Sequence, residues 1–383
     1  MTTWCARLLL VIRVVLMASL LQASEKPGEE DPVLIGVIFS ETGIAARHNK
    51  PLVEMIELAV DRINSKGGVL GRQIELLLLD NKSTPIGALE AASEAVAAHV
   101  TAVIGAHWSS HSLAMAPLLQ KEGIPMISPG STNPAVTMGR NYVFRACFID
   151  SMQGMAMARF ASQELKVKTT AVLHNIDEQY SIALADYFGR AFSAYGGKVV
   201  HDAGYRGDAT DFSAIIKQLL VIQPEAVYIP GYTRDTALFM KQARRMGLKA
   251  TFLGGDGWDL LGNLITDAVE GSYQTVAWHP DVPYPESRVM QELYMERHDN
   301  AEIQNLTTPL AYDAVMLLVD AIRRAGATEP ARVRAALAAT RDFPGATGPI
   351  TFDDNGDPVG KEIIIVKYLH GTTVFTAAVK PQP

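Results

Sequence analysis

The chain has 383 residues, of which 48% are hydrophobic and 20% are charged, an ordinary composition for a globular protein. This length exceeds what one hydrophobic core usually organises, so it predicts two domains. The net charge is −7 at neutral pH and the chain has no basic stripe, which argues against a nucleic-acid partner.

The N-terminal segment differs from the rest of the chain. Arg7 and Arg13 are its only charged residues, residues 8–21 are otherwise apolar, and the run ends near the small residue Ala23. This pattern is typical of a secretory signal peptide, here residues 1–23, cleaved near Ala23. The run is shorter than the roughly 20 residues that span a bilayer, although an uncleaved membrane anchor is the alternative.

Signal cleavage would change both the charge and the cysteine content. It removes two of the 34 basic residues and none of the 41 acidic ones, which leaves a net charge of −9. It also removes Cys5, so Cys147 remains alone and no internal disulfide is expected. No later segment is long and apolar enough to cross a membrane, so we expect no direct membrane insertion after cleavage.

Strand-like and helix-like segments alternate from residue 33 onwards. Residues 33–39 are apolar and β-branched, as in a buried strand, and residues 51–65 carry an apolar stripe at helical spacing. The alternation continues with strand-like runs at 74–79, 102–104 and 124–127 and helix-like segments at 86–98 and 111–121. Such alternation predicts βαβ units and a parallel sheet.

A second α/β series begins near Asp150. It predicts helices at 152–165, 181–195, 211–222 and 234–246, and strands at 170–173, 198–201, 226–229 and 251–253. Helices at 286–297, 308–325 and 330–339 follow without strong strands between them, and β character returns at 350–352 and 362–368. The fold class is therefore α/β with two similar lobes.

Short polar clusters follow directly on the strand-like runs in both series. They are residues 40–42, 109–110, 128–132, 177–180, 231–233 and 255–257. In an open α/β sheet, ligands bind just beyond the carboxyl ends of the strands. Because the clusters fall in both halves of the chain, they indicate one ligand held between two lobes.

Residues 63–71 resemble the Ile-Asn-x-x-Gly-Gly-(Ile/Val)-x-Gly segment of the periplasmic leucine/isoleucine/valine-binding proteins. Further segments resemble this family in the same order, namely residues 103–105, 109–110, 127–132, 144–145, 211–213, 242–244, 247–248, 348–352 and 356–357. The resemblance covers about residues 33–368. It implies the type I periplasmic-binding fold, with two doubly wound parallel-sheet lobes joined by a three-strand hinge and the ligand in the cleft.

The resemblance also implies a division of the chain. Lobe 1 would comprise residues 32–149 and 280–360, and lobe 2 residues 150–279 and 361–383. The late helices would then return to the first sheet. The family needs no cofactor, and we expect none here. His107 and His111 are spaced for a metal on a helix face, but no third ligand accompanies them, so we expect no metal.

An α-amino acid presents a carboxylate and an ammonium group on one carbon. Hydroxyls and backbone N–H groups at a helix N-terminus suit the carboxylate. The family residues that match Ser109, Gly130 and Thr132 hold this group, and Ser131 supplies a further donor beside them. The alternative is that these residues are helix caps and turn residues.

The ammonium group needs an acid, and the resemblance implies that Asp256 supplies it. Tyr180 and Tyr232 match tyrosines that close over the ligand from the second lobe, where an aromatic face beside a cation adds roughly 0.5–2 kcal/mol. The alternative reading is a loop acid in a glycine turn and two core tyrosines. Trp258 lies nearby, but as a lone aromatic residue it is better explained as core.

The specificity pocket would be lined by the residues that match His48, His107 and Trp108, with Glu41 and Thr307 as further candidates. Aliphatic binders tend to have small or apolar groups at the second and third of these positions. The sequence therefore disfavours leucine, isoleucine and valine, and leaves a polar, aromatic or smaller amino acid open. The disulfide common in those binders has its positions at Ser83 and Trp108 here and is not formed.

The resulting hypothesis is a periplasmic solute-binding protein that takes a free α-amino acid and delivers it to the membrane permease of an ABC importer. The alternative is a ligand-sensing domain for amino acids, amides or small aromatic carboxylates that signals to a receptor. An enzyme is disfavoured because the chain has no Gly-x-Ser-x-Gly elbow, P-loop or His-Glu-x-x-His motif.

Overall fold

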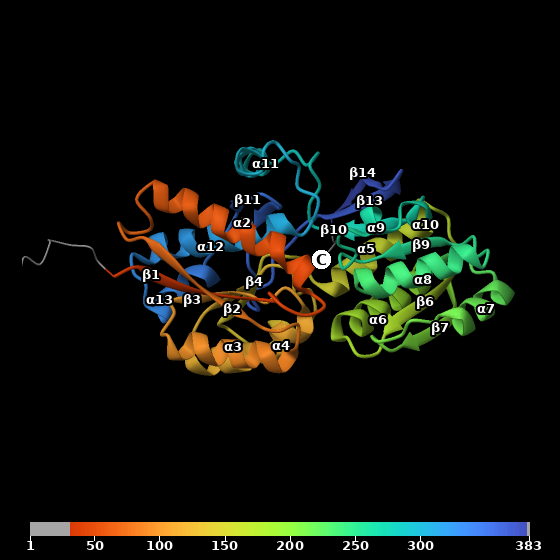
Figure 1. Ribbon diagram of the computed structural model, residues 1–383, viewed down its shortest axis with the longest axis horizontal. Helices are drawn as coiled ribbons and strands as arrows, with labels where there is room; N and C mark the ends of the chain where they lie inside the picture. The colour runs from red at the N-terminus through yellow and green to blue at the C-terminus, as the bar shows by residue number, and fades with distance from the viewer. Residues whose placement is uncertain (1–30, 381–383) are drawn as a thin grey trace, which may run out of the picture. The chain divides into compact units, whose positions relative to one another are not determined.

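The computed structural model describes residues 31–380, and residues 33 onwards form one compact unit. The predicted signal peptide lies outside the described residues. No helix within residues 31–380 combines the length and the apolarity needed to cross a membrane. The strands gather into two large sheets and one small two-stranded sheet (Figure 1).

The first sheet has five strands in the order β2-β1-β3-β4-β5, and every neighbouring pair is parallel. Its strands are β1 (Val33–Phe39), β2 (Ile74–Asp80), β3 (Ala102–Gly105), β4 (Met126–Ser128) and β5 (Val143–Arg145). β1 is buried along nearly its whole length because helices cover both faces of the sheet. The predicted parallel α/β architecture is confirmed for this sheet.

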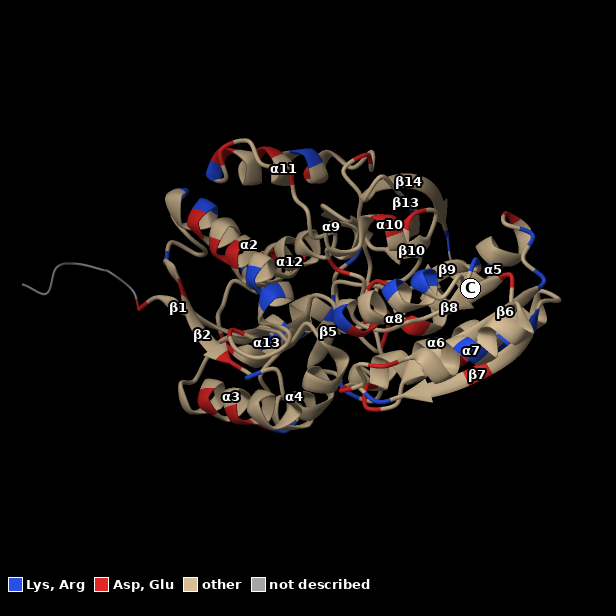
Figure 2. Ribbon diagram, turned by 45° about the vertical axis from the view of Figure 1, so that its right-hand side comes forward, with Lys and Arg blue, Asp and Glu red and all other residues tan. Residues whose placement is uncertain are grey.

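Helices lie on both faces of the first sheet. One face carries α2 (Ala46–Ser65), α12 (Thr308–Ala325) and α13 (Pro330–Ala338), and the other carries α3 (Pro85–Ala97) and α4 (Ser109–Glu122) (Figure 1). α11 (Pro285–Arg297) packs against α2. Leu52 and Ile56 of α2 share one core cluster with Val315 of α12 and with Val37 of β1. The late helices thus pack on the first sheet. Figure 2 shows acidic and basic residues sharing α2.

The second sheet has seven strands in the order β14-β13-β10-β9-β8-β6-β7. These are β6 (Thr169–Asn175), β7 (Lys198–Tyr205), β8 (Ala226–Tyr228), β9 (Thr251–Gly254), β10 (Tyr273–Val276), β13 (Ile363–Leu369) and β14 (Thr372–Val379). The strands from β10 to β7 are parallel, but β13 is antiparallel to both β10 and β14.

The expectation of a wholly parallel second lobe is therefore wrong at one edge. β13 and β14 are joined by His370 and Gly371, whose φ angles are 53° and 79°. Positive φ at both central residues defines the tight turn that joins antiparallel strands, whereas parallel strands need a long crossover. The sheet is thus mixed, with a C-terminal hairpin beside the parallel strands.

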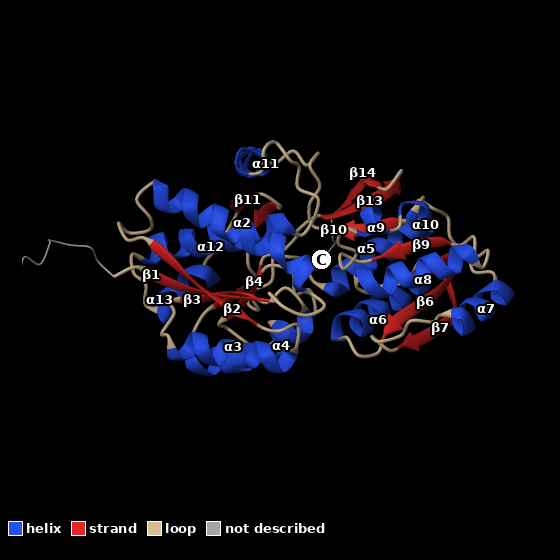
Figure 3. Cartoon of the chain, in the orientation of Figure 1, coloured by secondary structure: helices blue, strands red, loops and turns tan. Residues whose placement is uncertain are grey.

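The second sheet is also covered on both faces (Figure 3). α5 (Asp150–Gln163) and α6 (Gln179–Ala194) pack against each other on one face. The other face carries α7 (Ser213–Ile222), α8 (Thr233–Arg245) and the short α9 (Leu261–Leu264) and α10 (Thr266–Val269). The remaining elements are the 3-10 helix η1 (Pro134–Val136) and the antiparallel pair β11 (Phe343–Gly345) and β12 (Gly348–Ile350).

The chain passes between the elements of the two large sheets three times, between β5 and α5, between β10 and α11, and between β12 and β13. This agrees with the three-strand connection of the predicted fold class. The lobe boundaries at residues 149/150, 279/280 and 360/361 stay a prediction.

A buried arginine holds the segment that follows β4. Arg145 is fully buried, and its Nε lies 2.6 Å from Oδ1 of Asp357. Its guanidinium also donates to the carbonyls of Ser131 and Asn133, at 2.5 and 3.1 Å. These bonds fix the backbone of residues 131–133 from below, because guanidinium donors in a dry environment hold their acceptors strongly.

Replacing this arginine should destabilise the protein. Arg145→Met leaves the carboxylate of Asp357 buried without its counter-charge, so we expect a loss of about 3–5 kcal/mol in the free energy of unfolding. Urea denaturation followed by circular dichroism measures it. Arg190→Met is the matched control, since its side chain is 79% exposed and pairs only with Asp186 at helical spacing. Equal stability of the two variants would contradict the structural role of Arg145.

Candidate functional site

A small cavity lies where loops from both large sheets meet. Most of the residues predicted to bind a ligand line it, together with Gly257, and the full lining is His107, Trp108, Ser109, Gly130, Tyr180, Tyr232, Asp256 and Gly257. These residues follow the carboxyl ends of β3, β4, β6, β8 and β9. The cavity has a volume of about 10 Å³, which is room for a single water molecule. The two lobes therefore meet closely around this site.

The first lobe brings the N-terminus of α4 to the cavity. The helix begins at Ser109, not at residue 111 as the apolar spacing predicts, so Ser109 is in its first turn rather than before it. The first N–H groups of a helix have no intrahelical acceptor, and the helix dipole makes this end favourable for an anion. The Ser109 hydroxyl accepts a hydrogen bond from the backbone N–H of Asn133 at 3.2 Å, which ties α4 to the next loop.

The segment after β4 contributes backbone rather than side chains. Ser131 and Thr132 are not among the described residues that line the cavity. The Ser131 hydroxyl lies 2.7 Å from that of Ser112 and 3.1 Å from the carbonyl oxygens of Ala106 and His107, so it braces the loop. Their side chains are therefore better placed to hold the loop than to meet a ligand.

Gly130 allows the close approach that builds this wall. A Cβ atom at Gly130 would lie 2.2 Å from Nδ1 of His107, far inside van der Waals contact. Only glycine leaves the imidazole of His107 in its place. The absence of a side chain thus determines which groups of the first lobe reach the cavity.

The second lobe brings a buried carboxylate. Asp256 Oδ1 accepts a hydrogen bond from the Tyr180 hydroxyl at 3.0 Å, and the Asp256 backbone N–H donates to Gln153 Oε1 at 2.8 Å. Burial raises the pKa of Asp256 to about 6, although the bonds from Gln153 and Tyr180 work against this rise. Burial, and then the charge of Asp256, raise the pKa of Asp150 well above its usual range. The site is therefore rich in negative charge and poor in water.

Aromatic rings from the two lobes stack across the cavity. The rings of Trp108 and Tyr232 are nearly parallel, at 6°, with their centroids 3.9 Å apart. Tyr180 continues the row behind Tyr232 at 5.2 Å, and His111 continues it behind Trp108 at 5.6 Å. The row joins α4 of the first lobe to the loops of the second, and forms one wall of the site.

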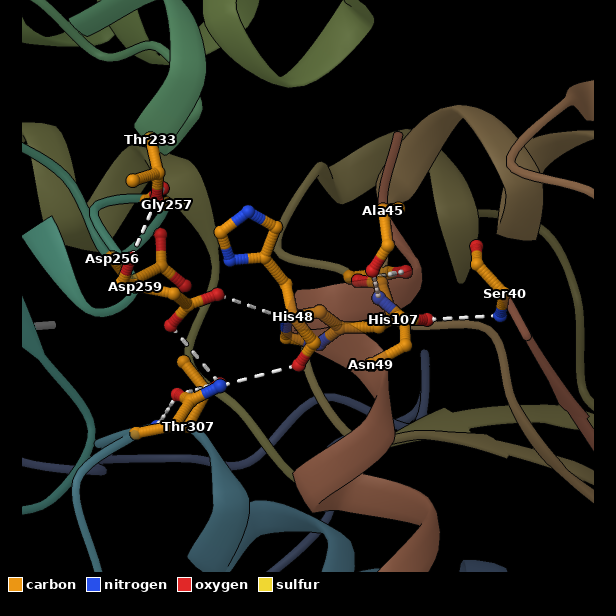
Figure 4. A network of polar contacts seen from close by, with 12 residues as sticks. Ser40, Ala45, His48, Asn49, His107, Thr233, Asp256, Gly257, Asp259 and Thr307 are labelled. Carbon is orange, nitrogen blue, oxygen red and sulfur yellow. Dashed lines mark hydrogen bonds and ion pairs between the residues drawn. The ribbon is translucent and has the colours of Figure 1, made fainter. Parts of the chain in front are cut away.

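A polar network centred on Asp259 closes the opposite side (Figure 4). Asp259 Oδ2 lies 3.6 Å from Nε2 of His107, and the Thr307 hydroxyl donates to Asp259 Oδ1 at 3.2 Å. The Thr233 hydroxyl donates to the backbone carbonyl of Asp259 at 2.7 Å. His107 and Thr307 flank elements of the first sheet and Asp259 follows β9 of the second, so the carboxylate links the two lobes.

Sequence reasoning missed Asp259 and Gln153. Asp259 lies in the same post-strand turn as Asp256, and a second acid at that spacing was the available signal. Gln153 lies one turn into α5, and only the fold brings it to Asp256. Trp258 is buried and donates from Nε1 to the carbonyl of Ile229 at 3.1 Å, as expected of a core residue. Glu41 is exposed.

His48 lines a second, larger cavity of about 300 Å³. Trp108 and Tyr232 line both cavities, so the stacked rings separate them. Burial lowers the pKa of His48, which keeps the imidazole neutral at physiological pH. His48 therefore belongs to the surroundings of the site rather than to the small cavity itself.

The family model described as periplasmic binding protein matches residues 32–372. A leucine-, isoleucine-, valine-, threonine- and alanine-binding protein of Pseudomonas aeruginosa is 30% identical over 335 residues, covering 85% of this chain and 87% of the relative. These proteins bind solutes and are not enzymes. The chain belongs to the periplasmic binding protein family.

Solved structures agree with this assignment. The leucine-binding protein LivK of Thermotoga maritima is 37% identical and superposes with a TM-score of 0.87, covering 91% of this chain and 99% of that one. LivJ of Streptococcus pneumoniae, a branched-chain amino acid transporter substrate-binding protein solved with isoleucine, is 29% identical with a TM-score of 0.85. That match covers 91% of this chain and all of LivJ.

The raised pKa of Asp256 makes ligand-free stability depend on pH. The folded carboxyl holds its proton more tightly than the unfolded one, whose pKa is near 3.8, so its stabilising contribution is complete below pH 3.8 and lost as pH rises through about 6. Between pH 4 and 7.5, the free energy of unfolding should fall by about 2–3 kcal/mol more for the wild type than for Asp256→Asn.

Chemical denaturation at several pH values measures this difference. The control is Asp186→Asn, which removes an acid whose side chain is 48% exposed, and whose offset from the wild type should not vary with pH. A constant offset for Asp256→Asn across the same range would show that its carboxyl has an ordinary pKa.

Proposed function

We propose that this chain is the extracytoplasmic solute-binding protein of an ABC importer, and that it binds an α-amino acid in the cleft between its lobes. The observation that carries the proposal is the juxtaposition of the α4 N-terminus and Gly130 on one lobe with Asp256 on the other. An anion site faces a buried acid across one small cavity, which matches the two charges of a zwitterion.

Each proposed contact follows from the chemistry of its group. The ligand carboxylate would lie against the first turn of α4, where Ser109 and the backbone around Gly130 offer hydrogen-bond donors. The ammonium group would lie against Asp256, with the ring of Tyr180 or Tyr232 beside it. A cation there supplies the counter-charge that the buried carboxylate lacks, so binding lowers the pKa of Asp256 and stabilises the folded protein.

Closure of the two lobes on the ligand is supported by the contacts that already bridge them. These are the stacked rings of Trp108 and Tyr232, the approach of His107 to Asp259, and a hydrogen bond from Asn133 Nδ2 to the carbonyl of Gln179 at 3.0 Å. Lobe movement about a few connecting strands is the usual hinge mechanism. The closed protein would deliver its ligand to a membrane permease in the periplasm.

A thermal-shift screen of the twenty amino acids tests the amino-acid proposal. A ligand at 100 times its dissociation constant adds about 2.7 kcal/mol, which should raise Tm by about 5 °C. The α-keto analogue of the best ligand should give no shift, because it lacks the ammonium group that Asp256 would bind.

The same screen on Asp256→Asn should lose the shift, while the exposed control Asp186→Asn keeps it. A flat melting temperature with every amino acid would rule out this class of ligand for the protein.

Export is tested separately from binding. If residues 1–23 are a cleaved signal peptide, the protein isolated from the periplasm of a Gram-negative host should begin near Ser24. N-terminal mass spectrometry after osmotic shock measures this, and Arg7→Glu with Arg13→Glu should reduce the exported amount because the positive n-region is lost. Full-length protein retained with the membrane would instead support the uncleaved anchor.

A further inference from the structure

Trp108 and Tyr232 form a wall between two cavities of very different size. The small cavity holds the groups proposed to bind the backbone of the ligand, and the larger one, of about 300 Å³, begins on the other side of the rings. On the opposite side of the small cavity, the contacts of Asp259 with His107 and Thr307 occupy the space. Room for a long ligand side chain is therefore found past the two rings.

The larger cavity is acidic. Its charged lining consists of Asp177, Glu178, Asp208, Asp235, Arg206 and Arg234, with His48 held neutral by burial. Both arginines are already engaged, because Arg206 lies 3.4 Å from Asp177 and Arg234 lies 3.6 Å from Asp235. Four carboxyl groups thus face two guanidinium groups, and a cationic ligand group would correct the imbalance.

Glu178 is the acid best placed to receive that group. It precedes α6, and its Oε2 is buried and accepts no hydrogen bond from any residue within the described range. Burial raises the pKa of Glu178 to about 7, and the neighbouring Asp235 and Asp177 add to the rise. A carboxyl group that is left unpaired in a partly dry cavity is costly unless a donor reaches it. An aliphatic side chain would leave that cost in place.

The two rings add a requirement of shape. They are parallel to within 6° and belong to opposite lobes, so lobe opening separates them and closure brings both faces onto whatever lies between or beside them. A guanidinium group is planar, stacks on aromatic faces and presents a fork of donors to a carboxylate, whereas an ammonium group is a compact, strongly hydrated point charge. The ring pair and the acid beyond it together favour a planar cation.

We propose that the ligand is an α-amino acid whose side chain ends in a guanidinium group, which stacks on Trp108 and Tyr232 and reaches Glu178. The inference rests on the proposed function, since it takes the α-carboxylate and α-ammonium groups to bind at Ser109 and Asp256. It differs from the branched-chain ligands in the names of the similar proteins because those side chains carry neither charge nor planarity.

Isothermal titration calorimetry of the full protein with L-arginine, L-citrulline, L-lysine and L-leucine tests the proposal. Citrulline keeps the length and planarity of arginine without its charge, and lysine keeps the charge without the planarity. Arginine should bind at least about tenfold more tightly than each of the other three, since a charge-assisted hydrogen bond and a stacked cation are both lost otherwise.

Two variants assign the preference to these residues. Glu178→Gln should bring the ratio of arginine to citrulline affinity close to one, and Trp108→Leu should reduce the ratio of arginine to lysine affinity. Glu164→Gln, an exposed acid at the far end of α5, is the control and should keep both ratios. Melting temperatures without ligand verify that each variant is folded.

The outcomes separate this inference from the function on which it rests. If leucine, lysine or citrulline binds as tightly as arginine, or if Glu178→Gln keeps the arginine to citrulline ratio, the guanidinium proposal is overturned and the amino-acid function stands. If none of the twenty amino acids binds, both are overturned.

Discussion

The structure depends on a carboxylate that is kept out of water. Asp256 sits at the end of β9 with its oxygen bonded to Tyr180 and its backbone bonded to Gln153. A buried anion is unfavourable unless a partner of opposite charge reaches it, and within the described residues no lysine or arginine lines its cavity. The folded protein therefore carries a local energetic deficit that a cationic group corrects, and the surrounding groups hold that deficit in a fixed position.

The two lobes share the task of building one site because neither contains all of its parts. The first lobe supplies donors from the start of α4 and from a loop that Arg145 holds rigid, while the second supplies the acid and the tyrosines. Parallel α/β sheets favour this division, since their carboxyl-end loops point to the same edge and two such edges can face each other. The contact between His107 and Asp259 then joins the lobes at their polar surfaces.

Sequence patterns predict this fold and much of the candidate site, and they fail where distant segments meet. The buried strand at residues 33–39 and the polar residues after β3 and β9 follow from local hydrophobic patterns. Pro51 favours a helix start, yet α2 runs from Ala46, because the preceding turn packs under the cleft loops. Gln153 and the bracing role of Ser131 had no local signal, since both depend on contacts between segments far apart in the chain.

The size of the small cavity has a kinetic consequence under the proposed function. A space of about 10 Å³ admits no amino acid, so solute enters only while the lobes are apart. The observed affinity is then the intrinsic affinity reduced by the fraction of time that the protein spends open. Substitutions that weaken the stacking of Trp108 on Tyr232 would raise that fraction without touching a ligand. The speed of capture and the residence time of the solute would thus be set by contacts between the lobes as well as by contacts to the solute.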